Sequence, residues 1–319
     1  MKASSVVAMA ALLLALVGVA LFGQNTSINF VVTALIVALA AQGWNLLGGY
    51  CGQFSFGHAA FFGTGAYVSA VLQSRYGVNA WAGAGIGIAA GAGIGGVIGW
   101  LSFRAGLRGS YFALITLAFA EVLRIVANAT SITGGGTGLL LKLDVSASNF
   151  QFSSRGVFCL IALACVLLVL ALTTWLSRSR LGAQFAAVRE NEDAAQALGI
   201  DVLATKLRAI ALSGAVTAAA GCLYVQYFLY LDSNIAYGSW ISVESLLAVI
   251  VGGIATPAGP IIGALALHAL GEGTRLLAGR ITGIDLVLFG LILVAATAFA
   301  PTGIAGVWKS LSARLRARA

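Results

Sequence analysis

Long apolar runs, without the alternation typical of a half-buried strand, follow one another along most of the chain. A helix needs about 20 apolar residues to cross a bilayer, and runs of about this length occur at 6–22, 28–47, 80–101, 110–128, 156–177, 207–230, 258–278 and 283–300. Two shorter runs, interrupted by glycine, lie at 56–73 and 241–256. Because lipid offers no partners to backbone polar groups, each segment must satisfy them internally as a helix. The pattern predicts an all-α polytopic membrane protein of about ten transmembrane helices, two of them short or re-entrant.

The composition favours a single membrane domain over residues 1–319. Hydrophobic residues make up 60% of the chain and charged residues 9%, whereas a soluble domain carries about 25% charged residues. The first run follows Lys2 and fits a cleaved signal peptide, which is one interpretation of it. A dense membrane domain follows at once, so we expect an uncleaved first span.

Basic residues distribute unevenly over the loops between these runs. With the N-terminus inside, the cytoplasmic segments hold twelve Lys and Arg residues and the outer segments hold five. Cytoplasmic loops of membrane proteins carry such an excess, so both termini are predicted in the cytoplasm. The rule also accounts for the net charge of +8 without nucleic acid as a partner. Membrane lipid is the expected surrounding.

One short stretch concentrates charge in the middle of this apolar chain. Residues 178–208, a predicted cytoplasmic loop, hold five basic and four acidic residues. Within 187–201, acidic and small residues stand together before a glycine that is typical of a helix C-cap: Glu190, Glu192, Asp193, Ala194, Ala195, Ala197 and Gly199. A solvated connector helix would show the same acids and glycine. The alanine-rich side instead favours a short helix that docks into a groove of a partner.

Glycine recurs at every fourth position of the run at 80–101, at Gly83, Gly87, Gly91, Gly95 and Gly99. On a helix this spacing forms a groove along one face, which predicts close packing of another helix. The stretch GAGIGG within it matches a dinucleotide-binding pattern, but it lacks the preceding strand and the following acid that such a site needs. Helix packing is the better explanation.

The chain offers few residues for catalysis or metal binding. It contains no G-x-x-x-x-G-K-[ST] phosphate loop, no H-E-x-x-H and no G-x-S-x-G. His58 and His268 are the only histidines, and the four cysteines stand singly among apolar or glycine-rich neighbours. We therefore expect no metal site, no cofactor held by this chain, and transport rather than enzymatic activity.

Polar residues in and beside the two interrupted runs are candidates for a translocation pathway. Hydrophobic segments broken by Gly or Pro in corresponding halves of a transporter point to its binding site, and Gly48–Gly65 and Gly252–Gly263 fit this description. The candidate polar groups are Gln53, Ser55, His58 and Glu244. Helix-end capping and close packing would explain the same residues equally well. Elsewhere, Glu121 and Arg124 lie three apart on one span and are expected to neutralise each other.

Several stretches carry a family resemblance. Asp193-Ala194-Ala195, followed after three residues by Gly199, resembles the E-A-A-x-x-x-G signature of ABC-importer permeases, with Asp in place of Glu. The chain also looks like the LivM type of branched-chain amino acid permease in GWNLLGGYCGQFSFGHAAFFGTGAYVSA (43–70), RGSYFALITLAFAEVLR (108–124), TGGGTGL (133–139), VIVGGIATPAGPIIGA (249–264) and FAPTGIAGVWK (299–309). One departure is Gly136-Thr137, where relatives often have Ser-Asp, so a ligand role for that acid is absent.

The resemblance implies the partners and their division of labour. In such importers a second, homologous permease subunit shares the pathway, two ATPase subunits bind ATP and Mg, and an extracytoplasmic binding protein delivers substrate at the bacterial inner membrane. The charged loop is then the coupling helix, with Arg189, Glu190, Glu192, Asp193, Ala194, Ala195 and Gly199 as its candidate contact residues. The family carries branched-chain amino acids, and related systems carry urea, short amides or aromatic acids, so the substrate stays open among these.

The alternative function is an ion-driven secondary transporter or channel that works without ATPases. Such a protein would usually carry several ionisable groups within its spans. Here Glu244 is the main candidate of this kind. The sparse charge and the coupling-like loop argue against this alternative.

Overall fold

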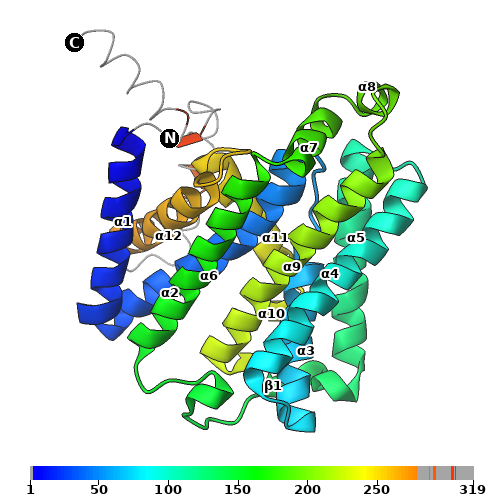
Figure 1. Cartoon of the computed structure of the whole chain (residues 1–319). Coiled ribbons are helices and arrows are strands. Elements are labelled where there is room, and N and C mark those ends of the chain that lie inside the picture. The colour runs from blue at the N-terminus through cyan, green and yellow to red at the C-terminus, as the bar shows by residue number, and fades with distance from the viewer. Residues whose placement is uncertain (1–2, 279–286, 288–289, 292–302, 305, 307–319) are drawn as a thin grey trace, which may run out of the picture.

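The computed structural model describes residues 3–278, 287, 290, 291, 303, 304 and 306, and the span predicted at 283–300 lies almost wholly outside them. Most described residues are helical (Figure 1). The helices are α1 (Ala3–Phe22), α2 (Asn25–Trp44), α3 (His58–Tyr76), α4 (Ala80–Arg104), α5 (Gly109–Ala129), α6 (Arg155–Leu176), α7 (Arg180–Glu190), α8 (Glu192–Ala197), α9 (Val202–Phe228), α10 (Ser233–Ala236), α11 (Ser239–Gly252) and α12 (Gly259–Ala278). A short antiparallel sheet pairs β1 (Leu139–Leu140) with β2 (Tyr230–Leu231).

Six described segments are long and apolar enough to cross a membrane: Asn25–Tyr50, Ala80–Arg104, Gly109–Ala129, Arg155–Leu176, Val202–Phe228 and Ser233–Gly252. They coincide with predicted runs, with ends that differ by several residues. Three further helices, α1, α3 and α12, have 20, 19 and 20 residues and also follow predicted runs. The protein is thus a predominantly helical, multi-pass membrane protein, whereas the number of ten spans stays a prediction.

The chain between α2 and α3 is less regular than the apolar pattern suggests. α2 passes into a six-residue π-helix, Asn45–Tyr50, and helical structure resumes only at His58. The first amides of a helix have no partner within the helix itself. One of them, the N–H of Ala59, donates to the Ser242 hydroxyl of α11 over 2.9 Å. The start of α3 is therefore held inside the protein by a neighbouring helix.

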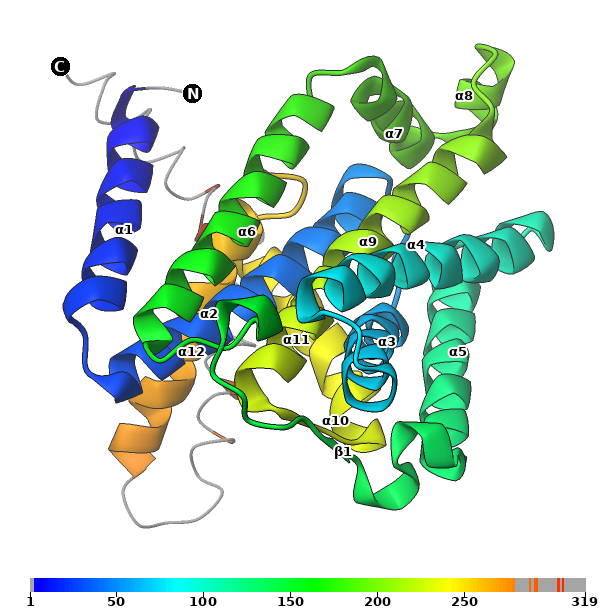
Figure 2. The ribbon, with the colours of Figure 1, turned by 60° about the horizontal axis from the view of Figure 1, so that its bottom comes forward.

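α2 and α9 form the centre of the assembly. Nearly all of α2 from Val31 to Trp44 is buried, and α9 contacts α2, α3 and α4. In Figure 2, α1 and α12 flank α2 on one side of the molecule, and α4 and α5 lie on the other side. α5 consequently sits at the edge of the helix assembly, where few described elements cover it.

The five regularly spaced glycines of α4 face α3 and α9. A Cβ at Gly87 would lie 2.7 Å from the carbonyl oxygen of Gly65, and a Cβ at Gly95 would lie 2.8 Å from that of Ile210. No atom lies within 4 Å of a Cβ added to three other glycines of α4, namely Gly85, Gly93 and Gly96. The four-residue spacing thus forms a seam in which the backbones of neighbouring helices nearly touch.

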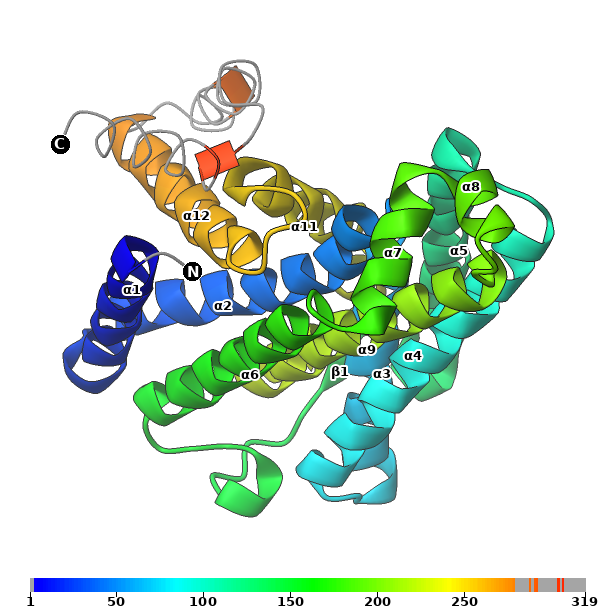
Figure 3. The same ribbon diagram turned by 45° about the horizontal axis from the view of Figure 1, so that its top comes forward.

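Charged and polar elements gather at two opposite ends of the molecule. At one end, which we call the α8 end, α7 and α8 project beyond the spans (Figure 1). Figure 3 shows this end turned forward, with α8 beside α5 and α9. The other end, called the β1 end, carries the sheet and the loop before α6. Side chains hold this loop in place, since Asn79 and Trp81 donate to the carbonyls of Ser148 and Ala147 over 2.9 and 2.8 Å.

Candidate coupling site and translocation segments

The charged stretch at 187–201 consists of two helices rather than the one continuous helix that its composition suggests. α7 ends at Glu190, and Asn191 adopts an extended conformation (φ −161°, ψ 115°). The Asn191 side-chain oxygen accepts a hydrogen bond from the Ala194 N–H over 3.0 Å and so caps α8. Asparagine favours this capping position over a helix interior. The break gives α8 an orientation of its own, independent of α7.

α8 ends at a left-handed residue. Gly199 has φ +83°, a conformation that glycine adopts without steric cost. The N–H of Ile200 then donates back to the Ala195 carbonyl over 3.1 Å, and the Asp201 carboxylate caps α9 through the Ala204 N–H over 2.9 Å. The short helix is therefore fixed at both ends by local hydrogen bonds.

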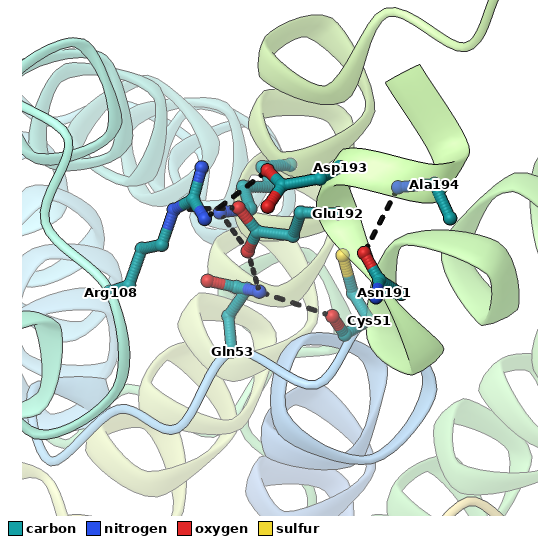
Figure 4. A network of polar contacts seen from close by, with 8 residues as sticks. Cys51, Gln53, Arg108, Asn191, Glu192, Asp193 and Ala194 are labelled. Carbon is teal, nitrogen blue, oxygen red and sulfur yellow. Dashed lines mark hydrogen bonds and ion pairs between the residues drawn. The ribbon is translucent and has the colours of Figure 1, made fainter. Parts of the chain in front are cut away.

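Glu192 connects α8 to three other parts of the chain (Figure 4). Its Oε2 lies 3.1 Å from Arg108 Nε, just before α5, and its Oε1 accepts a hydrogen bond from Gln53 Nε2 over 3.2 Å. The same Oε1 forms an ion pair with Lys206 Nζ of α9. Arg108 also reaches Asp193, with 3.5 Å between Nη1 and Oδ1. We call Gln53, Arg108, Glu192, Asp193 and Lys206 the Glu192 cluster.

The interior of this cluster is shielded from solvent. The Lys206 side chain is only 4% exposed and the Glu192 side chain 15%. The ammonium group of Lys206 also lies 5.1 Å from the centre of the Phe103 ring, a distance that suits a cation–π contact. Burial also raises the pKa of the nearby Cys51 thiol to about 12, with a smaller lowering by Lys206 and a raising by Glu192. The cluster is a partly buried ionic contact rather than a surface ion pair.

The other side of α8 faces outward. The Asp193 side chain is 79% exposed, and the flanking residues Glu190, the last residue of α7, and Leu198, just after α8, are 73% and 81% exposed. Ala195, in contrast, is buried. Two hollows of about 480 and 320 Å³ border α8, the first against Phe103, Leu107 and Leu203 and the second against Gly52 and Arg189. α8 thus has one exposed face with acidic and apolar residues, while its other face is anchored to the rest of the chain.

Arg189 anchors the end of α7 to the segment after α2. Its Nη1 donates to the Gly49 carbonyl over 3.2 Å, and its Nη2 pairs with Glu190 over 2.8 Å. Gly52 has φ +72°, and a Cβ there would lie 2.7 Å from the Arg189 side chain. A side chain at position 52 would collide with Arg189, so only glycine allows the backbone to pass this close to the arginine. Arg189 faces inward, whereas Glu190 and Asp193 face outward.

The four residues predicted for the pathway do not lie together. Gln53 belongs to the Glu192 cluster at the α8 end. Ser55 and His58 are fully buried nearby, where the Ser55 carbonyl accepts from Trp44 Nε1 over 2.8 Å and His58 Nε2 lies 2.9 Å from the Ser213 hydroxyl. Capping and close packing account for these contacts.

Glu244 lies on α11 and faces α12 instead. Its Oε1 is 3.6 Å from His268 Nδ1, and the His268 ring packs edge-on against Phe30 of α2. The two side chains are 30% and 14% exposed. The partner of Glu244 was missed by sequence reasoning, because the two residues stand on different helices and no local pattern joins them.

Asn45 was also missed, although it joins the two interrupted segments. Its Nδ2 donates to the Thr256 carbonyl over 3.0 Å, and its Oδ1 accepts from the Ala255 N–H over 2.9 Å. Both bonds bridge the π-helix after α2 and the bend between α11 and α12. The polar side chain of Asn45 among apolar residues near the end of its run was the available signal.

The described residues contain no group of three or more His, Cys, Asp or Glu side chains able to hold a metal ion. Their geometry defines a multi-pass membrane protein with a charged, anchored helix that projects from one end. Comparison then shows the particular family: residues 26–297 match the branched-chain amino acid transport system permease component. The chain belongs to this family of ABC-transporter permeases.

Curated relatives extend over most of the chain. It is 29% identical over 305 residues to the high-affinity branched-chain amino acid transport system permease protein LivM of Escherichia coli K12, covering 87% of this chain and 69% of that protein. It is 28% identical to LivM of Salmonella typhimurium, with the same coverage. The permease LivH of Salmonella typhimurium is 27% identical, covering 87% of this chain and 94% of LivH. No solved structure matches significantly. The relatives are transport permeases rather than enzymes.

Proposed function

We propose that this chain is the transmembrane permease subunit of an ABC importer for branched-chain amino acids or related small polar solutes. A second, homologous permease subunit would form the translocation pathway with it. Two ATPase subunits would supply energy from ATP and Mg, and an extracytoplasmic binding protein would deliver the solute. Family membership supports the class. The names of the LivM and LivH relatives support the substrate class and the pairing of two permeases.

The anchoring of α8 carries the coupling part of the proposal. Its Glu192 carboxylate contacts the start of α5, the start of α9 and the segment that leads into α3. An ATPase that grips the outward face of α8 would pull on all three at once. Because the contact is ionic and shielded from water, a displacement of α8 would move the starts of α5 and α9 and the segment before α3, rather than only rearranging side chains.

The mechanism that follows is alternating access. ATP binding would draw the two ATPase subunits together, and α8 would move with the groove in which it is seated. The starts of α5 and α9 would tilt, and a cavity open to the β1 end would accept solute from the binding protein. ATP hydrolysis would reverse the tilt and release the solute inside.

The topology of the proposal places the α8 end in the cytoplasm. Ten spans with both termini inside, in the bacterial inner membrane, agree with the excess of basic residues on that side. The contacts of Arg108 and Lys206 with α8 support this assignment, since they bring three predicted cytoplasmic segments together. Residues 178–208 would then be a cytoplasmic loop within one permease domain of residues 1–319.

Replacement of Asp193 by arginine tests the coupling role. The outward position of Asp193 predicts that the variant folds, loses solute uptake, and no longer shows ATP hydrolysis stimulated by loaded binding protein. Leu143→Arg, which introduces the same side chain at an exposed position of the β1 end, is the control and should transport normally. Full, ATP-coupled uptake by Asp193→Arg in proteoliposomes would remove α8 from the mechanism.

A further inference from the structure

The exposed face of α5 holds an ion pair inside a predicted span. The buried residues of α5 are Phe112, Ala113, Thr116, Ala120 and Ala127. The opposite stripe, left uncovered by the described part of the chain, consists of Tyr111, Leu114, Ala118, Glu121, Ile125 and Asn128. Glu121 is the only acidic or basic residue of this otherwise largely apolar stripe. It lies about 12 Å before the end of α5, at 1.5 Å per residue.

Glu121 and Arg124, which we call the Glu121 pair, meet through two parallel contacts. Arg124 Nε donates to Glu121 Oε2 over 2.9 Å, and Arg124 Nη2 donates to Oε1 over 2.6 Å. Arg124 Nη1 donates to Asn234 Oδ1 of α10 over 2.8 Å. Asn234 is itself held through its N–H by the Asp232 carboxylate over 2.8 Å. Arg124 is therefore oriented independently of Glu121.

Lipid is an unsuitable surrounding for this pair. Ionisable side chains within membrane spans almost always face a protein interior or a water-filled cavity, and they mark substrate pathways. The Glu121 side chain is 52% exposed and that of Arg124 30%, so the described chain provides neither surrounding. The second permease subunit and a pathway between the two subunits would provide both.

We infer that the Glu121 pair is a recognition site for a zwitterionic α-amino acid, an inference that rests on the proposed function. The guanidinium of Arg124 would bind the α-carboxylate through the fork that now holds Glu121, and the Glu121 carboxylate would accept the α-ammonium. Guanidinium groups match carboxylates in this two-pronged geometry. Leu117, Val122 and Ile125 are exposed on either side and offer an apolar surface to the solute side chain.

The charge balance of the site selects a zwitterion. In a zwitterionic ligand, the negative group would take the place of Glu121 beside Arg124, and the positive group would take the place of Arg124 beside Glu121. Every charge in the site would then face an opposite charge. A ligand with a single charge would leave either Glu121 or Arg124 without an opposite charge, so it would gain only one of the two charge-assisted contacts. The bond to Asn234 would hold Arg124 in position while Glu121 exchanges its partner.

Thiol protection in the assembled transporter tests the site. Ala118→Cys, one turn before Glu121, is placed in a cysteine-free chain, and its maleimide labelling is timed without binding protein. L-leucine should slow the labelling, whereas 4-methylpentanoate, which lacks the ammonium, and 3-methylbutylamine, which lacks the carboxylate, should not. Glu121→Gln and Arg124→Gln should each raise the L-leucine concentration for half-protection about tenfold to hundredfold, the usual range for a lost charged hydrogen bond.

Glu272→Gln is the matched control, because Glu272 and Arg275 form a pair of the same spacing on α12; it should leave protection unchanged. Equal protection by all three compounds, or unchanged protection in both Glu121→Gln and Arg124→Gln, overturns the recognition site alone. ATP-driven L-leucine uptake by the wild-type complex is measured in parallel. Its absence overturns the proposed function and this inference together.

Discussion

Two groups of charged residues contact α5, one at its start and one in its second half, and they are built in different ways. The Glu192 cluster draws on four separate segments and shields its central carboxylate and ammonium from water. The Glu121 pair comes from one turn of α5 with one amide from α10, and both charges are partly exposed. The shielded arrangement of the first group suits a contact that holds helices together, as the proposed coupling requires. The exposed arrangement of the second suits a contact that can change partners, as the proposed solute recognition requires.

The largest expected effect on stability comes from Glu192→Ala. Lys206, with a side chain only 4% exposed, would keep a buried charge without its carboxylate, which costs about 3–5 kcal/mol. The midpoint of thermal inactivation in detergent should fall markedly, and Glu192→Gln combined with Lys206→Met should recover most of it. Glu190→Ala, at an exposed position, serves as control and should cost less than about 1 kcal/mol. An equal loss in both single variants would contradict a shielded cluster.

A second prediction concerns the thiol beside the cluster. Because burial raises the pKa of Cys51 to about 12, its thiolate is scarce at pH 8 and increases about tenfold per pH unit up to that value. Maleimide should label Cys51 about a thousandfold more slowly than an exposed cysteine such as Ala118→Cys. Mass spectrometry of timed reactions measures both rates. Glu192→Ala should accelerate only Cys51, and fast labelling of Cys51 in the intact chain would speak against the closed packing.

A smaller effect is expected for Arg108→Ala, which separates α5 from α8. The Arg108 side chain is 60% exposed, so stability should change by less than about 1 kcal/mol. Solute transported per ATP should nevertheless fall up to about fivefold, because α5 would follow α8 less closely. Arg104→Ala, at the end of α4 and stacked over Trp100 at 5.1 Å, is the control. The same loss in both variants would show a general charge effect instead of coupling.

The smallest effect on stability is expected for Glu121→Gln. The pair is exposed and lies on one helix, and such pairs contribute little to folding. The thermal midpoint should stay within error of the wild type even though L-leucine protection weakens. A midpoint lowered as far as in Glu192→Ala would mean that the Glu121 pair is a structural contact, and the contrast between the two charged groups would disappear.

Hydrophobic runs predicted the helices well because the signal is local. A run of about 20 apolar residues indicates a membrane-spanning helix whatever elements pack against it in the folded protein. The family resemblance is confirmed by the match over residues 26–297. The number of spans and the position of the termini stay predictions. The break at Asn191 was missed, because acidic and small residues on both sides of it favour one continuous helix.

Contacts between distant parts of the chain could not be predicted in this way. Gln53, a residue predicted for the pathway, lies against Glu192, 139 positions later, and this contact was not predicted. Lys206 had the ordinary appearance of a basic residue flanking a span. Asn45 bonds to Ala255 across 210 positions. Each of these pairings is set by helix packing, which periodicity along one segment does not encode.

The seam of small residues on α4 has a consequence for movement. Where two helices meet through backbone atoms, no interlocking side chains have to change rotamer when one helix shifts along the other. Separating the helices, in contrast, would lose the close contacts of Gly87 and Gly95 at once. Gliding of α4 along α3 and α9 is therefore cheaper than parting from them, so a conformational cycle would keep this boundary closed and admit solute elsewhere.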